Sequence, residues 1–357
     1  MNMASHPSTF TVRSANLDMP NDCAAIDAFV RARTEGTPFH LTAWSRAITK
    51  ACRQKSHYLI AEDGAGTIAG VLPLTAIRSP LFGSALVSSG FAVDGGVIAD
   101  SASIADQLTQ AAIYMATKLN CPTVELRGGV MPGAAWQHND ATYLGFARDL
   151  AADDEAELLA IPRKQRAEVR KGLGFDLTIE TGKTKRNVDA HYAVYATSVR
   201  NLGTPVFPKK LFGAVLDMFG DDADILTVRQ DGIAIASVLS LFHDGAVMPY
   251  WGGGTAAART WRANDIMYFA LMRFARERGC TRFDFGRSKA GTGPAAFKRN
   301  WGFEGVALPY AKLSLDGNPP RDINPMSPKY RMQVAVWQKL PLWLANRLGP
   351  MISRGLG

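Results

Sequence analysis

The sequence has few cysteines, and nothing in it forms a metal-binding pattern. Its four cysteines, Cys23, Cys52, Cys121 and Cys280, are far apart and never form a Cys-x-x-Cys pair. None of its six histidines belongs to a His-x-His or His-Glu-x-x-His motif. Zinc sites and disulfide frameworks require such clusters. We therefore expect free, mostly buried thiols in a reducing compartment and no bound metal.

Long apolar runs are also missing, because no stretch approaches the length needed to cross a membrane. Residues 1–9 lack the basic region and apolar core of a secretory signal. No Gly-x-Ser-x-Gly elbow is present and no cysteine adjoins a histidine, so covalent catalysis has no support. We expect a cytoplasmic protein and leave open a peripheral contact at the inner face of the plasma membrane.

Acidic residues are absent after Asp322, although the net charge of the whole chain is +8. The last stretch holds five cations, which are Lys329, Arg331, Lys339, Arg347 and Arg354. Apolar residues such as Trp337 and Trp343 alternate with them, and Pro341 and Pro350 should kink any helix there. Two interpretations fit this tail, a terminal helix packed on the protein and a contact with an anionic membrane surface.

What is present points to a duplication. With 357 residues, the chain exceeds the usual size of one domain. Residues 58–74 and 225–241 each read as a strand, an Asp-Gly turn and a second strand. Residues 121–128 and 280–286 each read as a strand that follows a helix. Two pairs in the same order predict a repeated α/β unit.

We expect a first domain over residues 1–152, a second over 153–316 and a basic amphipathic tail over 317–357. The border follows a strand around residues 143–146, and Thr42 is a candidate N-cap. Amphipathic patterns predict helices at residues 22–33, 42–53, 153–172, 188–201 and 208–219.

Residues 282–303 form the more informative of two candidate sites. A short strand with Phe283 and Phe285 should lead into a glycine-rich loop and one helical turn. The loop region contains Arg287, Lys289 and Lys298, and no carboxylate lies between positions 284 and 304. Such a loop suits an anionic ligand or a developing oxyanion, and a plain connection with solvated charges fits equally well.

The second candidate lies in residues 248–264, where a strand should run into three glycines before a helix. Free backbone amides at Gly252, Gly253 and Gly254 could hold a phosphate, with charge added by Arg259 and Arg262. The pattern is neither a Walker loop nor Gly-x-Gly-x-x-Gly, so a structural turn is an equal alternative.

Three segments together resemble the FemAB family: residues 198–208, the run Tyr250-Trp-Gly-Gly, and residues 283–303. More narrowly, they resemble the FemAB-related proteins of PEP-CTERM/exosortase exopolysaccharide loci, and the similarity extends over nearly the whole chain. The resemblance implies an α/β fold of two tandem GNAT-like acyltransferase domains, the second BioF2-like. It also implies transfer of an acyl or aminoacyl group to an amine of an envelope or exopolysaccharide precursor.

The resemblance assigns roles in the transfer. Lys298 matches a lysine placed near the transferred carbonyl, where a cation would stabilise the oxyanion by roughly 3 kcal/mol. Arg287 and Lys289 would hold a phosphate or carboxylate of a substrate. Asp94 loosely matches an acidic residue of the acceptor cleft and would accept the proton of the amine. A turn aspartate is the alternative for Asp94.

Three further residues, Arg46, Arg200 and Tyr250, fall in segments that bind the acceptor in the family. The donor would be acyl-CoA or aminoacyl-tRNA, and the basic run of residues 163–171 would be the place for tRNA contacts. The chain lacks the long coiled-coil insertion of Fem ligases that use tRNA, which leaves acyl-CoA open. Two alternatives are a non-catalytic module recruited to a membrane by the tail, and a nucleic-acid-binding protein.

Overall fold

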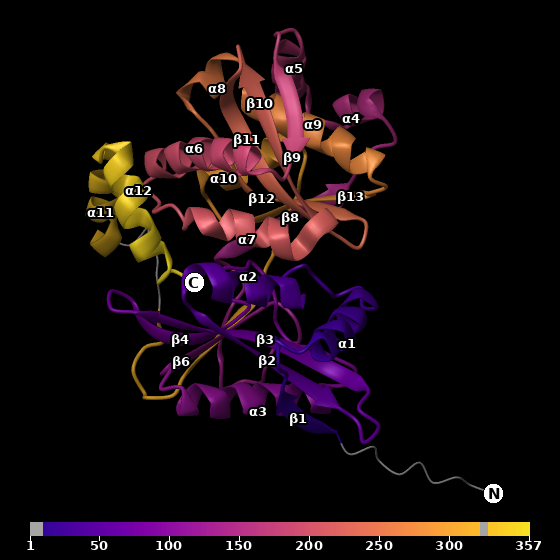
Figure 1. Ribbon diagram of the computed structural model, residues 1–357, viewed down its shortest axis with the longest axis vertical. Coiled ribbons are helices and arrows are strands. Elements are labelled where there is room, and N and C mark those ends of the chain that lie inside the picture. Colours follow the sequence, from indigo (N-terminus) through magenta and orange to yellow (C-terminus); the bar gives the residue numbers. More distant parts are fainter. Residues whose placement is uncertain (1–9, 322–327) are drawn as a thin grey trace, which may run out of the picture.

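The computed structural model describes residues 10–321 and 328–357. Residues 1–9, for which the sequence predicts no secretory signal, lie outside the described residues. Two halves, each built around one sheet, are stacked along the long axis of the molecule (Figure 1). The N-terminal sheet contains β1 Thr11–Ser14, β2 Lys55–Glu62, β3 Ile68–Ser79, β4 Gly83–Ser88, β5 Ile98–Ala99, β6 Thr123–Arg127, β7 Gln137–Asn139 and β15 Tyr310–Ser314. The second sheet contains β8 Tyr143–Asp149, β9 Thr178–Gly182, β10 Ala223–Gln230, β11 Ile233–His243, β12 Ala246–Gly254, β13 Arg282–Lys289 and β14 Gly305–Ala307.

Helices cover the faces of both sheets. Those of the first half are α1 Pro20–Arg31, α2 Thr42–Cys52 and α3 Ala102–Lys118. Those that follow are α4 Asp154–Ala160, α5 Arg163–Leu173, α6 Lys185–Asn201, α7 Lys209–Phe219, the 3₁₀ turn Gly220–Asp222, α8 Ala256–Thr260, α9 Ala263–Glu277, α10 Gly293–Asn300, α11 Pro328–Lys339 and α12 Leu342–Ser353.

The two sheets have the same strand order. The first runs β1-β2-β3-β4-β6-β15-β7, with β5 paired to β3, and the second runs β9-β10-β11-β12-β13-β8-β14. The sixth strands are exchanged between the halves, because β15 follows the second half in the chain and β8 precedes it. The predicted duplication is therefore visible in the topology.

This exchange bears on the expected domains. The strand expected at the end of the first domain is β8, and it pairs with β13 and β14 in the second sheet. Conversely, β15 lies within the expected second domain and pairs with β6 and β7 in the first sheet. An alternating pattern identifies a strand but not the sheet edge that receives it.

Three apolar cores hold the layers together. One lies between the halves and joins side chains of α1 and α2 to those of α6 and α7, so that α2 and α7 face each other (Figure 1). A second core packs α9 against the far face of the second sheet, and a third packs α3 against the far face of the first. An apolar layer thus joins the two halves between these helices.

Local structure departs from the sequence expectations in three places. Thr42 is the first residue of α2 and not its N-cap, because Asp27 accepts hydrogen bonds from the Thr42 amide and hydroxyl at 2.8 and 3.0 Å. The expected helix over residues 153–172 is two helices, α4 and α5, separated at Pro162. Strand β13 extends to Lys289, and α10 replaces the single expected turn.

The tail forms α11 and α12, which pack against α6. Trp337 and Ala345 are buried there, whereas Trp343 and Met351 are each 69% exposed. One face of the tail is therefore packed and another presents apolar side chains to solvent. Among the described residues, no helix has the length and apolar character needed to span a membrane.

Candidate active site

Lys298 is a buried cation on α10. Its ammonium donates hydrogen bonds to the carbonyl oxygens of Gly286 and Arg287, each at 3.0 Å, and lies 5.3 Å from the ring centre of Phe146. Burial lowers the pKa of Lys298 to about 8, and the neighbouring Asp284 carboxylate opposes this shift. An ammonium has three donors, and the described residues accept only two of its hydrogen bonds. One donor remains for a ligand oxygen.

One carboxylate, Asp284, lies near this lysine, and a second, Asp94, lies near Asp284. Burial raises the pKa of Asp284 on β13, and the charge of Asp94 adds to that shift. Burial likewise raises the pKa of Asp94, which accepts a hydrogen bond from the Gly95 amide at 2.6 Å. Asp94 packs over Gly128, where a side-chain Cβ would come within 2.2 Å of its carboxylate. Position 128 therefore requires glycine for Asp94 to occupy this place.

Tyrosines connect these groups across the halves. Tyr250 of β12 donates to the carbonyl of Phe91 at 2.6 Å, and Tyr310 of β15 donates to the carbonyl of Val93 at 2.6 Å. Arg287 donates to the Tyr310 hydroxyl at 2.7 Å. The loop that carries Asp94 is thus held by one strand from each sheet.

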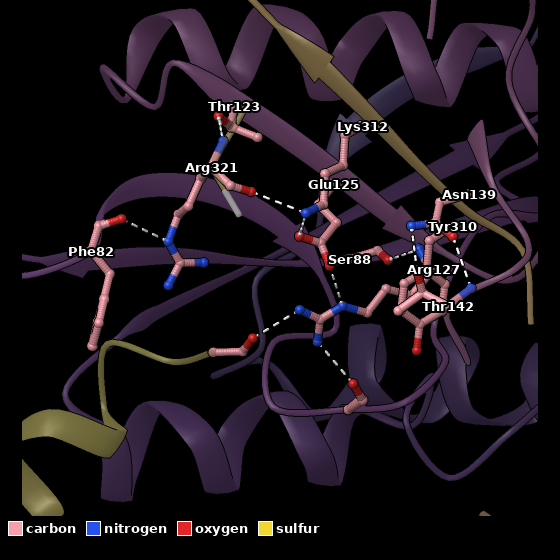
Figure 2. A network of polar contacts seen from close by, with 12 residues as sticks. Phe82, Ser88, Thr123, Glu125, Arg127, Asn139, Thr142, Tyr310, Lys312 and Arg321 are labelled. Carbon is pink, nitrogen blue, oxygen red and sulfur yellow. Dashed lines mark hydrogen bonds and ion pairs between the residues drawn. The ribbon is translucent and has the colours of Figure 1, made fainter. Parts of the chain in front are cut away.

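Figure 2 shows the network of the first sheet beside this region. Arg127 donates to the Glu125 carboxylate at 2.7 Å and to the carbonyls of Ala92 and Gly357, each at 2.8 Å. Lys312 donates to the carbonyl of Arg321 at 3.0 Å. Next to these residues opens a cavity of about 830 Å³ that Arg287 and Lys289 also line.

Four of the predicted residues therefore converge: Lys298, Asp94, Tyr250 and Arg287, with Lys289 on the cavity wall. Sequence reasoning assigned no role to Asp284, Tyr310 and Arg127. Asp284 lies within residues 283–303, which carry the family resemblance, so the sequence did contain a signal for it. Tyr310 could not, because only the strand exchange brings β15 to the first sheet.

The three glycines lie in β12 and not in a loop. A Cβ at Gly253 would meet the Ser198 hydroxyl at 2.4 Å, and one at Gly254 would meet Asn264 at 2.5 Å. Glycine is needed here so that helices α6 and α9 can approach the strand.

Strand β12 also separates from its neighbour. It pairs in parallel with β13 only at Ala246 and Val247, and its pairing with β11 shifts register at Tyr250. Beyond these residues no ladder pair joins the two strands, so they separate.

The remaining predicted residues lie apart from Lys298. Arg46 is exposed on α2. Burial raises the pKa of Asp27 on α1, and the hydrogen bonds from Thr42 and the charges of Arg31 and Arg46 oppose that shift. Arg200 donates to the carbonyl of Gln338 at 3.1 Å and so holds the end of α11. Arg259 is exposed on α8, and Arg262 pairs with Glu168 of α5 at 2.6 Å.

The separating β12–β13 pair lies in a segment that matches a known family. Residues 161–299 match the family model described as acetyltransferase (GNAT) domain. The match covers α5 to α10 and so includes β12, β13 and Lys298. These residues therefore contain a GNAT acetyltransferase domain, in agreement with the predicted acyltransferase. Among curated protein sequences, none matches this chain.

Solved structures give the same fold over most of the chain. The crystal structure of FemX aligns with a TM-score of 0.65 at 15% identity and covers 84% of this chain and 96% of FemX. A tandem GNAT protein of the clavulanic acid biosynthesis pathway aligns with a TM-score of 0.55 at 11% identity, covering 87% and 100%. The C-terminal domain of a putative lysylphosphatidylglycerol synthetase from Agrobacterium fabrum aligns with a TM-score of 0.56 at 13% identity, covering 83% and 92%.

These likenesses confirm the predicted tandem GNAT-like fold. Within the part of the chain that the structure describes, no group of histidine, cysteine, aspartate and glutamate side chains could hold a metal ion. Cys23, Cys52, Cys121 and Cys280 are free thiols, all but the first buried.

Proposed function

We propose that this GNAT-type transferase forms an amide on an amine of an envelope or exopolysaccharide precursor, with Lys298 at the transfer centre. The observation that carries the proposal is the buried ammonium with one remaining donor, at the place where residues of both halves converge. The amine nitrogen attacks the carbonyl of an ester or thioester, a C–N bond forms, and the alcohol or thiol leaves with a proton.

Lys298 would stabilise the oxyanion that develops during attack. A positioned donor of this kind contributes about 3 kcal/mol to lowering the barrier. The two carbonyls fix the ammonium, and its position between apolar rings strengthens its field by excluding water. The charge is retained at neutral pH because the pKa stays at about 8.

Asp94 would accept the proton that the amine loses. Its raised pKa brings it closer to that of a general base working near neutrality. Asp284 stands close enough to influence that carboxylate and is a second candidate for the same proton. We assign the base to Asp94 because the hydrogen bonds of Tyr250 and Tyr310 hold its loop from both halves.

The donor would enter where β12 and β13 separate. The amides of β12 from Gly252 to Gly254 could bind the donor there, with Arg259 and Arg262 near its phosphates. The GNAT match favours acyl-CoA as that donor. Aminoacyl-tRNA is the competing donor, and its contacts would fall on α5, which carries the basic run of residues 163–171.

The acceptor would occupy the space between the halves, with Arg46 and Arg200 as further binding residues. Acceptors with an amine, as in amino sugars and peptide precursors of PEP-CTERM/exosortase-type exopolysaccharide systems, fit the family resemblance. The direct test is a mass-spectrometric assay with acyl-CoA and charged-tRNA donors and amine-bearing precursors. Transfer from either donor supports the proposal, and transfer from neither to any amine contradicts it.

A second function, peripheral membrane attachment, has its own observation. The exposed apolar side chains on the tail are Met332, Val336, Trp343 and Met351, and the exposed cations Lys339 and Arg347 lie among them. Such a surface suits anionic lipid headgroups above an apolar layer. Flotation with anionic and neutral vesicles tests this. Loss of binding to anionic vesicles in Trp343→Ser supports attachment, and equal binding of both proteins contradicts it.

A further inference from the structure

The loop that carries Asp94 is held by side chains and not by a helix or a sheet. Residues 89–96, called the Asp94 loop, follow β4 and form neither helix nor strand. Each carbonyl of residues 90–93 accepts a hydrogen bond from a side chain of a different element. The bonds run from Trp44 of α2 to Gly90 at 3.1 Å, from Tyr250 of β12 to Phe91 at 2.6 Å, from Arg127 of β6 to Ala92 at 2.8 Å and from Tyr310 of β15 to Val93 at 2.6 Å. Elements of both halves thus hold one loop.

His40 holds the same loop beyond Asp94. Its Nε2 lies 3.0 Å from the carbonyl oxygen of Gly96, and its Nδ1 lies 3.2 Å from the amide nitrogen and 2.8 Å from the hydroxyl oxygen of Thr37. A carbonyl only accepts and an amide only donates, so Nε2 carries the proton and Nδ1 accepts. Burial lowers the pKa of His40 to about 4, which keeps the ring neutral at neutral pH. His40 is therefore a fixed donor to the Asp94 loop.

The backbone of the Asp94 loop is strained where these side chains hold it. Ser89 and Phe91 have φ angles of 43° and 67°, in the left-handed region that residues with a Cβ avoid. The Ser89 hydroxyl donates to the carbonyl of Phe39 at 2.6 Å, and the ring of Phe91 packs edge-on against Phe207. Such conformations persist only where the surroundings impose them, and they cluster at functional sites. The contacts thus set one conformation for the loop.

We propose that Trp44 and His40 are positioning residues that hold Asp94 in place for the proton transfer. Their side chains are 0% and 1% exposed, and they bind the loop on either side of Asp94, at Gly90 and Gly96. A general base must stay within hydrogen-bond distance of the proton it accepts, and a displacement of about 1 Å can lower a rate by about 10². This inference rests on the proposed function, in which Asp94 is the base, and deepens it by assigning the residues that hold that base.

The position of these two residues distinguishes them from the tyrosines that join the halves. Trp44, His40 and Asp94 all belong to the first half, so the two hydrogen bonds act within that half. They act on the backbone of the loop, whereas packing over Gly128 restricts the Asp94 carboxylate itself. Backbone and side chain of Asp94 are therefore both held, as a base that must be in place before the amine arrives requires.

The test separates positioning from stability by means of transfer rates and urea denaturation of the full chain. Trp44→Phe keeps an aromatic ring but removes the indole donor, so it should lower kcat/KM for the acceptor about tenfold and leave KM for the donor unchanged. In Asp94→Asn no carboxylate remains to be positioned, so Trp44→Phe should change its residual rate by less than about twofold. Trp337→Phe is the matched control, because it alters a buried tryptophan of α11 whose indole donates no hydrogen bond to the described residues.

His40 supplies a second pair of variants, which serves if Trp44→Phe does not fold. His40→Gln retains an amide donor for the Gly96 carbonyl, whereas His40→Leu has none. The value of kcat/KM for the acceptor should fall about tenfold in His40→Leu and no more than about threefold in His40→Gln.

The outcomes separate this inference from the proposed function. A loss in Trp44→Phe that disappears in the Asp94→Asn background supports the positioning role, as does rescue by His40→Gln. An equal loss in both backgrounds, an equal loss in Trp337→Phe, or unchanged rates in Trp44→Phe and His40→Leu would overturn it and leave Asp94 as the base. Full activity of Asp94→Asn would instead refute the base assigned in the proposed function, and the positioning role with it.

Discussion

Each half places a carboxylate at the same strand position, but the pKa values of these two carboxylates shift in opposite directions. Glu125 of β6 and Asp284 of β13 are each the fourth residue after a cysteine, and both strands occupy the fifth place in their sheets. Burial would raise the pKa of Glu125, but the charges of Arg127 and Lys312 lower it below its ordinary value. Burial raises the pKa of Asp284, and the nearby charges do not reverse that.

This difference shows that equivalent strands of a duplicated fold can have different roles. In the first half the arginine of the strand is neutralised by its neighbour and stabilises the packing. In the second half the equivalent strand carries Arg287, which has no carboxylate partner among the described residues, and supports Lys298. The arginine of β6 is thus structural, whereas Arg287 of β13 has donors available to a ligand.

Substitution of Lys298 should have the largest effect on the transfer rate. Lys298→Met is expected to lower kcat by about 10² to 10³, because a positioned donor to the oxyanion is lost. The fold should persist, since methionine fills a similar volume among the apolar rings. Acyl-transfer rates and circular dichroism measure both properties. Arg299→Met, which changes an exposed neighbour on α10, is the control, and an equal loss there would contradict the assignment.

Neutralising the two equivalent carboxylates should change stability in different ways. Glu125→Gln leaves the buried Arg127 without its partner and is expected to lower the free energy of unfolding by about 3 kcal/mol at pH 7. Asp284→Asn should leave it unchanged or raise it, because the folded state disfavours this charged carboxylate. Urea denaturation of both variants measures the difference.

The pH dependence gives a further check on that pair. The folded pKa of Glu125 is lowered, so its stabilisation is present above the ordinary value of 4.5 and is lost as the pH falls through the folded pKa. The gap between wild type and Glu125→Gln should therefore narrow on acidification. A gap that stays constant, or equal destabilisation by Asp284→Asn, would show that the two carboxylates do not differ.

Much of the duplicated architecture could be predicted from the sequence. The repeated hairpins became β2–β3 and β10–β11, because an Asp-Gly turn between apolar runs is a local signal. The motif around Lys298 was also local, and the GNAT match includes it. The tandem fold followed from these repeats and the family resemblance.

The rest depends on contacts between distant segments. Nothing near Tyr310 indicates that β15 joins β6 in the first sheet, so the exchanged strands and the two-sided cavity were not foreseen. The glycines of β12 read as a loop because the close approach of Ser198 and Asn264 is a tertiary contact. Arg200 matched a binding residue by position, whereas its hydrogen bond to Gln338 depends on where α11 packs.

Raising the pH should remove the positive charge of Lys298 in the second half. With a pKa of about 8, Lys298 loses its proton above that pH, and kcat at saturating acceptor should fall up to tenfold per pH unit. In Lys298→Arg the cation stays charged, so whatever activity remains should lack this decline. The pH profile of kcat for both proteins is the measurement. The same decline in both would assign it to another group.

The smallest expected effect concerns the hydrogen bonds that join the halves. Tyr250→Phe removes the donor to the Phe91 carbonyl and should lower the free energy of unfolding by about 1 kcal/mol. Because that bond also holds the loop of Asp94, the Michaelis constant for the acceptor should rise while kcat changes less. Tyr114→Phe, an exposed tyrosine of α3 on the far side of the first sheet, is the matched control. If Tyr250→Phe changed stability alone, the tyrosine would only join the halves, and the first half would not position the acceptor through it.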